Sequence, residues 1–125
     1  MGFGTNNGQA FDDLFRYDPT SDSWNQVASL GIGMQDPCYF VVGNIAYVGL
    51  GNTRISNSLV RHFYGYNPQT NSWSQISDNN NFDYYSLGTG FSYGNKGSVA
   101  IISTDSSARN TICQYNPSND SWSEM

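Results

Sequence analysis

Short apolar runs alternate with polar segments along the whole chain, and most of the polar segments are rich in Gly, Asn or Ser. No window carries apolar residues at a sustained helical spacing. The runs contain many β-branched and aromatic residues and are bounded by turn-forming residues, which is typical of β-strands. The pattern predicts an all-β fold with strands over residues 11–17, 24–27, 38–42, 45–51, 59–66, 73–76, 87–93, 98–103, 111–115 and 121–125.

One motif occurs three times, as Tyr17–Trp24, Tyr66–Trp73 and Tyr115–Trp122, at a spacing of 49 residues (66 − 17 and 115 − 66). Each copy reads Tyr, Asp or Asn, Pro, a polar loop and then Ser-Trp. Proline stops a strand because it lacks a backbone donor, and the polar residues after it favour a tight hairpin. Since three regular copies indicate architecture, we expect packing roles for the repeated residues, which are Tyr17, Pro19, Trp24, Tyr66, Pro68, Trp73, Tyr115, Pro117 and Trp122.

Two features predict sheets that are covered on both faces. The run Cys38–Val42 is almost continuously apolar, as expected for a strand buried on both sides. The third predicted strand of each unit has apolar residues at two adjacent positions, which point to opposite faces of a sheet. The first of these positions holds Leu14, Phe63 and Ile112, and the next holds Phe15, Tyr64 and Cys113.

The motif and its period resemble the kelch repeat, in which each repeat forms one blade of a β-propeller. The segments Tyr47–Gly51 and Gly94–Gly97 are also similar to divergent bacterial kelch or galactose-oxidase-like propellers. The third unit departs from this pattern, because Ala100 and Ile102 take the places of Gly49 and Gly51. The resemblance implies a partial propeller of about two and a half to three four-stranded antiparallel blades. Its units are residues 1–27 (a partial blade with second to outer strands), 38–76 and 86–125, with 2–5 ending a second strand and 5–10 forming a polar loop.

The amino-acid composition limits the classes of partner that the chain is expected to bind. Ten acidic residues against five Lys and Arg give a net charge of −5, which argues against nucleic acid and anionic membranes as partners. No apolar run has the length of a membrane span, and Met1–Gly4 does not resemble a signal peptide. Scarce Lys and plentiful Asn, Ser and Tyr, together with the resemblance to bacterial kelch propellers, favour an extracytoplasmic or secreted bacterial protein. We expect Cys38 and Cys113 to be buried thiols, since they occupy different places in the repeat.

The sequence shows no catalytic constellation. The copper enzymes of the galactose-oxidase type need two His and two Tyr around the metal, and this chain has only His62, for which we expect a structural or surface role. The acidic pairs Asp12-Asp13 and Asp78 with Asp83 are interpreted as solvated loop residues. No zinc, phosphate-binding or calcium-binding spacing occurs, so we expect no catalytic residues, no metal and no cofactor.

The resemblance implies a non-catalytic binding or scaffold module that takes a protein or carbohydrate ligand. The alternative is one part of a carbohydrate-active enzyme, similar to galactose oxidase or the sialic acid epimerases, whose catalytic residues lie elsewhere. In such blades the loops between second and third strands and the loops between blades emerge at the same end. The residues of these loops that suit binding are Arg54, Arg109, Tyr84, Tyr85 and Asn80.

A partial propeller leaves the outer faces of its terminal blades uncovered. If each face carries about 500 Å² of apolar surface, covering it contributes about 10 kcal/mol. We therefore expect a partner for these faces. The chain itself, as a homo-oligomer that completes a propeller, and the remainder of a longer polypeptide stay open as alternatives.

Overall fold

The computed structural model describes residues 1–53, 60–80, 82, 86–103 and 110–125 of the chain. Every regular element in these ranges is a β-strand, which confirms the predicted all-β fold. Within the described part, no helix is long and apolar enough to cross a membrane.

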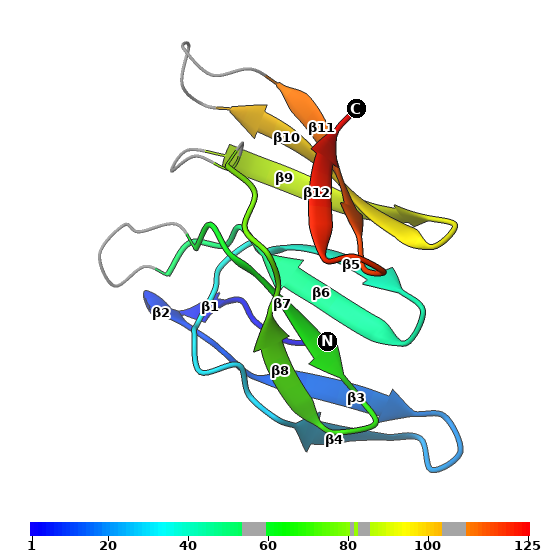
Figure 1. Cartoon of the computed structure of the whole chain (residues 1–125). Helices are drawn as coiled ribbons and strands as arrows, with labels where there is room; N and C mark the ends of the chain where they lie inside the picture. Colours follow the sequence, from blue (N-terminus) through cyan, green and yellow to red (C-terminus); the bar gives the residue numbers. More distant parts are fainter. Residues whose placement is uncertain (54–59, 81, 83–85, 104–109) are drawn as a thin grey trace.

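Two four-stranded antiparallel sheets make up most of the molecule (Figure 1). Blade 2 has the order β5-β6-β7-β8, and blade 3 has the order β9-β10-β11-β12, so strands adjacent in sequence are neighbours in space. The strands are β5 (Cys38–Val42), β6 (Ile45–Gly49), β7 (Phe63–Asn67), β8 (Ser72–Gln75), β9 (Ser86–Tyr93), β10 (Lys96–Ser103), β11 (Thr111–Asn116) and β12 (Ser121–Glu124).

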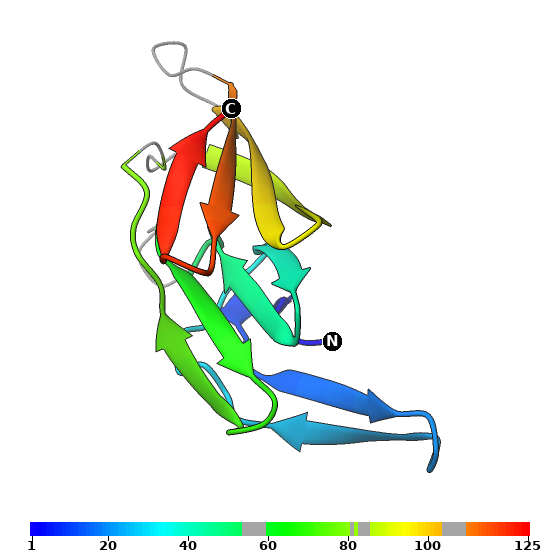
Figure 2. The same ribbon diagram turned by 45° about the vertical axis from the view of Figure 1, so that its right-hand side comes forward.

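The remaining strands precede blade 2 and form unit 1. Strands β3 (Leu14–Asp18) and β4 (Ser23–Val27) pair as a hairpin. Residues 1–3 run beside β3, because Gly2 bridges Leu14 and the Phe15 N–H donates to the Met1 carbonyl oxygen at 2.7 Å. Unit 1, blade 2 and blade 3 follow one another from bottom to top in Figure 2.

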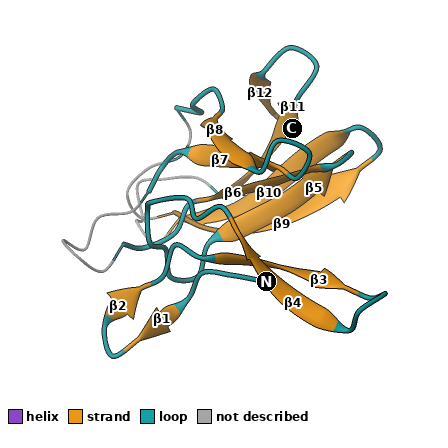
Figure 3. Cartoon of the chain, turned by 90° about the horizontal axis from the view of Figure 1, so that it is seen from below, coloured by secondary structure: helices purple, strands orange, loops and turns teal. Residues whose placement is uncertain are grey.

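The predicted polar loop over residues 5–10 is wrong, because these residues form a small hairpin of β1 (Thr5–Asn6) and β2 (Gln9–Ala10). Asn7 and Gly8 have positive φ angles of 49° and 82°, which is the backbone that a two-residue hairpin turn requires. The Asn-Gly signal was therefore present in the sequence. This hairpin and β3–β4 project in opposite directions when seen from below (Figure 3).

The third strands begin later than the predicted starts at residues 11 and 59. The residues before them bond to loops instead of to the sheet ladder. The Phe11 N–H donates to the Gly4 carbonyl oxygen at 2.9 Å, and the Val60 N–H donates to the Gly51 carbonyl oxygen at 2.8 Å. The apolar pattern alone cannot separate these loop residues from the strand that follows.

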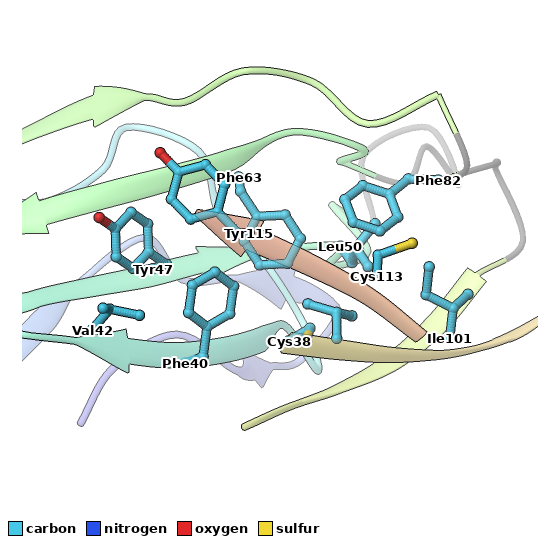
Figure 4. Packing of buried hydrophobic residues seen from close by; sticks show 11 residues of the cluster. Cys38, Phe40, Val42, Tyr47, Leu50, Phe63, Phe82, Ile101, Cys113 and Tyr115 are labelled. Atoms are coloured by element: carbon cyan, nitrogen blue, oxygen red, sulfur yellow. The ribbon is translucent and has the colours of Figure 1, made fainter. Parts of the chain in front are cut away.

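The main core lies between blades 2 and 3, and Phe40 is at its centre. Its ring lies 4.9 Å and 5.6 Å from the rings of Tyr47 and Phe63 in its own sheet, and 6.2 Å and 6.1 Å from those of Tyr115 and Trp122 in blade 3. Figure 4 shows side chains of both sheets meeting in one layer. The buried members are Cys38, Phe40, Val42, Tyr47, Leu50, Phe63, Phe82, Val99, Ile101, Cys113 and Tyr115.

The predicted burial of both faces fails on two strands. In β5 the side chains alternate, and Tyr39 and Val41 are 68% and 51% exposed while their neighbours are buried. Their face of β5 borders an apolar cavity of about 660 Å³, because unit 1 has no described inner strand to cover it. In β11, Ile112 is 38% exposed, because no described sheet packs on that side of blade 3.

A three-residue contact joins each blade to the unit before it, and we call it the Tyr-Asx-Trp latch. In blade 2, the Tyr66 hydroxyl and the Ala28 N–H both donate to Oδ1 of Asn71, each at 2.9 Å. The Trp73 indole N–H donates to the Ala28 carbonyl oxygen at 2.7 Å. The latch therefore bonds both the main-chain N–H and the main-chain carbonyl of Ala28, the residue that follows β4.

Blade 3 repeats the latch on Ser77, in the connection that follows β8. The Tyr115 hydroxyl and the Ser77 N–H donate to Oδ1 of Asp120 at 2.7 Å and 3.0 Å. The Trp122 indole N–H donates to the Ser77 carbonyl oxygen at 2.8 Å. In both latches the bound residue lies 45 positions before the tryptophan (73 − 28 and 122 − 77).

Candidate functional site

The candidate site lies at the end of blade 2 where the strand order brings two connections together. His62 directly precedes β7, and Asp78 follows β8 after a short interval. Because β7 and β8 are antiparallel, the start of one and the end of the other lie at the same end of the sheet. This is the loop end, where the loop residues were predicted to bind a ligand, and it is opposite the Tyr-Asx-Pro turns.

His62 and Asp78 form a close polar pair. Nδ1 of His62 lies 2.6 Å from Oδ1 of Asp78, with the two side chains 44% and 51% exposed. Nε2 of Gln75 lies 3.2 Å from the same imidazole nitrogen and 3.4 Å from the same carboxylate oxygen. With Nδ1 of His62 held by the carboxylate, the Nε2 atom of the ring remains for a further contact.

A small polar hollow of about 100 Å³ opens beside this pair. Phe82 is fully buried and provides an apolar wall. The His62 ring also makes an edge contact with Tyr64 at 6.5 Å between ring centres. Burial, together with the nearby negative charge of Asp78, raises the pKa of Tyr64, so this phenol stays protonated. The hollow is lined by Arg61, His62, Asp78, Asn79, Asn80 and Phe82.

The pair does not belong to the repeated architecture. At the 49-residue spacing, the place of His62 is taken by Asp13 in unit 1 and Thr111 in blade 3, and the place of Asp78 by Ser29. Thr111 uses its hydroxyl to donate to Glu124 at 2.8 Å, a contact within its own blade. Among the described residues, the pairing of an imidazole with a carboxylate at this end is therefore specific to blade 2.

Among the predicted binding residues, Asn80 lines the hollow and is exposed. Arg54, Tyr84, Tyr85 and Arg109 lie outside the described residues, so their roles stay predictions. The predictions did not include His62, Asp78 or Gln75 as a binding group. Comparing the repeats position by position would have singled out His62 and Asp78, because both differ from their equivalents.

Of the other acidic residues considered from the sequence, Asp83 lies outside the described residues, and Asp12 and Asp13 bind loops. Oδ1 of Asp13 accepts a hydrogen bond from the Phe3 N–H at 3.2 Å, and Oδ2 of Asp12 accepts one from the Gly31 N–H at 3.1 Å. Their partners are main-chain groups in separate segments. This is the arrangement of structural carboxylates.

Both cysteines are free and buried in the core between blades 2 and 3. Burial raises the pKa of the Cys38 thiol to about 12, which suppresses its nucleophilic thiolate form. Across the described residues, His, Cys, Asp and Glu side chains form no group of three that could hold a metal ion.

The residues of the repeated motif lie in the hairpins that join third and outer strands. The prolines occupy the turns, and each tyrosine faces its tryptophan across the strand pair, with ring centres 5.2 Å, 5.2 Å and 5.1 Å apart in the three copies. These hairpins point away from the hollow. The residues concerned are Tyr17, Pro19, Trp24, Tyr66, Pro68, Trp73, Tyr115, Pro117 and Trp122.

Comparison with known proteins agrees with this geometry. The sequence model of the Kelch motif matches residues 4–31. Among solved structures, YjhT is similar to the chain with a TM-score of 0.71 and 17% sequence identity, over 99% of this chain and 50% of YjhT. The chain thus spans about half the length of YjhT. A search of curated protein sequences finds no match.

The Kelch match covers the β1–β2 hairpin, β3 and β4, and the structural match extends the likeness to blades 2 and 3. Kelch motifs indicate modules that are generally involved in binding or scaffolding. The chain is an unclosed arc of kelch-type β-propeller blades.

Proposed function

We propose that the chain is a non-catalytic kelch-type binding or scaffold module whose loop end binds a carbohydrate or a protein. The observation that supports this proposal is the polar hollow beside His62 and Asp78. In a repeat protein, positions shared by all repeats maintain the architecture, and loops on one face often form the binding surface. The hollow lies at such loops and contains two residues that do not repeat.

The chemistry of the hollow suits hydroxyl and amide groups. Imidazole, carboxylate and carboxamide side chains together offer both donors and acceptors, as sugar hydroxyls require. A volume of about 100 Å³ is well below the roughly 300–1,000 Å³ of pockets that enclose a whole small molecule. The hollow therefore accommodates one projecting group of a larger ligand, such as the edge of a terminal sugar or one side chain of a protein.

Binding of the purified chain to an array of soluble glycans tests the proposal. His62→Ala and Asn80→Ala should each weaken binding about tenfold, because each removes a hydrogen-bonding group from the hollow. Arg54→Ala and Arg109→Ala extend the test to the other predicted loop residues. Gln69→Ala is the matched control, since Gln69 is exposed in a turn at the opposite end of blade 2. Equal affinity in all loop-end variants would show that the ligand binds elsewhere.

The alternative, one part of a carbohydrate-active enzyme, is favoured by a single observation. A carboxylate on Nδ1 of His62 orients the ring and leaves Nε2 able to accept a proton, which is the arrangement of a general base. Turnover of a sugar by the purified chain, lost in His62→Gln, would support this function over simple binding. Binding without turnover supports the module.

A further inference from the structure

One side of the hollow at the loop end of blade 2 is formed by the connection between blades 2 and 3. His62 belongs to blade 2, but Asp78 and Phe82 lie in the connection between β8 and β9. The chain leaves blade 2 at Ile76, whose N–H donates to a β7 carbonyl oxygen at 3.1 Å. The next residue, Ser77, is already bonded to blade 3.

Three hydrogen bonds fix Ser77 to blade 3. The Ser77 N–H donates to Oδ1 of Asp120 at 3.0 Å, and the Ser77 hydroxyl donates to Oδ2 of the same carboxylate at 2.8 Å. The Ser77 carbonyl oxygen accepts the Trp122 indole N–H at 2.8 Å. Figure 2 shows the turn between β11 and β12 beside the segment that follows β8. The main chain and the side chain of Ser77 are therefore both held by one hairpin of blade 3.

Trp122 also supports the apolar wall of the hollow. The rings of Trp122 and Phe82 make an edge contact, with 5.0 Å between their centres and 83° between their planes. Phe63 of blade 2 packs against both, with its ring centre 5.3 Å from that of Trp122 and 5.6 Å from that of Phe82. Phe82 lines the hollow, and Trp122 is behind it. One tryptophan thus contacts the connection both at Ser77 and at Phe82.

The bonds on Ser77 reach the polar pair of the hollow through a single peptide link. Consecutive Cα atoms are held about 3.8 Å apart, so a displacement of Ser77 moves Asp78 with it. Asp78 in turn lies 2.6 Å from Nδ1 of His62, and hydrogen bonds weaken when such a distance grows. The latch of blade 2 holds Ala28 in the same way, but the next residue there is Ser29, which has no carboxylate.

We propose that Asp120 and Trp122 of blade 3 are positioning residues for the hollow of blade 2. They hold the connection so that Asp78 faces His62 and Phe82 forms the apolar wall. Packing of blade 3 on blade 2 therefore completes the site, although neither positioning residue touches the ligand. The inference rests on the proposed function of the hollow, and it adds that binding at blade 2 depends on the contact with blade 3.

The imidazole of His62 is a direct probe of this arrangement, because the chain has a single histidine. Its side-chain NMR signals are therefore assigned at once, and Asp78→Asn gives their positions without the ionised carboxylate. Asp120→Ala should shift the His62 signals from the wild-type positions towards those of Asp78→Asn. Trp122→Phe keeps an aromatic ring but removes the donor to the connection, so it should shift them in the same direction.

The latch of blade 2 provides matched controls. Asn71→Ala and Trp73→Phe remove the equivalent hydrogen bonds, but these bonds hold Ala28 and not the connection beside His62. Both variants should lose stability as the blade 3 variants do and leave the His62 signals unchanged. Asp120→Asn also removes the charge but keeps an oxygen acceptor, as Asn71 has, and should stay close to the wild-type signals. Circular dichroism verifies that each variant remains folded.

Binding is measured separately on the glycan array. For a glycan whose binding His62→Ala weakens, Asp120→Ala should weaken binding about tenfold, whereas Asn71→Ala should not. Unchanged His62 signals in Asp120→Ala and Trp122→Phe would overturn the inference, and so would equal shifts in Asn71→Ala. If Asp120→Ala does not fold, Trp122→Phe compared with Trp73→Phe decides.

The two proposals fail in different ways. An array on which nothing binds would count against a carbohydrate ligand, while the His62 signals would still decide whether blade 3 positions the hollow. Glycan binding that depends on His62, with affinity and signals both unchanged in Asp120→Ala, would reject the positioning role and leave the proposed function in place.

Discussion

At the scale of single residues, the repeated tyrosine and tryptophan do more than fill space. The tryptophan indole donates to a main-chain carbonyl oxygen of the preceding unit, that of Ala28 in one case and Ser77 in the other. The tyrosine hydroxyl donates to the Asn or Asp side chain that accepts the N–H of the same residue. The latch thus supplies hydrogen bonds to the main chain of the connection between blades, where no sheet ladder supplies them. The asparagine or aspartate of the latch needs positive φ, a backbone region that these two residues tolerate well.

Replacing Trp73 with phenylalanine should therefore destabilise the fold by about 1–2 kcal/mol, because it keeps an aromatic ring but leaves the Ala28 carbonyl without its donor. Urea denaturation at a low protein concentration measures the change in the free energy of unfolding. Trp24→Phe provides the control, since no described group accepts a hydrogen bond from the Trp24 indole N–H. An equal loss in both variants would assign the effect to ring packing and not to the hydrogen bond.

The blade 3 latch should make stability depend on acid. Hydrogen bonds from the Ser77 N–H, and then from the Tyr115 hydroxyl, hold the pKa of Asp120 below its ordinary value. A lowered pKa in the folded state means that the carboxylate stabilises the fold above about pH 4 and that this contribution disappears as the pH falls through the lowered pKa.

Asp120→Asn removes this titration and keeps an oxygen acceptor, as Asn71 does in the blade 2 latch. The free energy of unfolding of the variant should therefore vary less with pH on the acid side than that of the wild type. Urea denaturation at a series of acidic pH values gives the slopes. Identical slopes for the two proteins would contradict the role of Asp120.

At the scale of strands, β5 approaches β9 and β10 closely because glycine is present where they meet. A Cβ placed on Gly90 would lie 1.9 Å from the Tyr39 carbonyl oxygen, and one on Gly97 would lie 2.1 Å from the Phe40 ring. Neither position could hold a side chain without moving a backbone or an aromatic ring. The close packing of β5 on blade 3 thus depends on positions without side chains, a feature that the apolar pattern does not reveal.

Gly90→Ala should destabilise the fold by about 1–3 kcal/mol, the usual range for overpacking a tight contact. Thermal and urea denaturation measure the effect. Thr89→Ala is the control, because Thr89 is the neighbouring residue on β9, is exposed and points to the other face. If both substitutions had similar small effects, the two strands would have to separate more easily than the structure indicates.

At the scale of the whole molecule, blades 2 and 3 share one core, whereas unit 1 joins blade 2 through a second cluster. The second cluster contains buried Met34, Val48 and Val60 with half-buried neighbours. No described sheet packs against the outer surface of unit 1 or of blade 3. Since the folding of each blade depends on a face that its neighbour covers, the described sheets should unfold as one cooperative unit.

Phe40→Ala should cost about 3–5 kcal/mol, because the ring contacts aromatic residues of both blades and its loss leaves a cavity between them. That is a large fraction of the roughly 5–15 kcal/mol that stabilises a typical domain. Tryptophan fluorescence and circular dichroism should still give one transition in the wild-type protein. Tyr39→Ala, at the adjacent exposed position of β5, should change the stability much less.

The sequence alone determined the class of fold and the repeated units, because the signals that predict them are local in the chain. The Tyr-Asx-Pro turns, the Gly43 and Gly94 hairpins and the two-residue alternation all depend on neighbouring residues, and they predict strands wherever they occur. The Asn7-Gly8 turn belonged to the same class of signal and was read as a loop because its strands are so short.

Only the tertiary structure decided which apolar positions are covered and which polar residues meet. Tyr39 and Phe40 are both aromatic and adjacent, yet one is exposed and the other is buried, because only one face of β5 has a sheet packed against it. His62 and Asp78 meet because two antiparallel strands end together, and Trp73 reaches Ala28 across 45 residues (73 − 28). Burial and long-range contacts depend on what the chain packs against, which local sequence patterns do not encode.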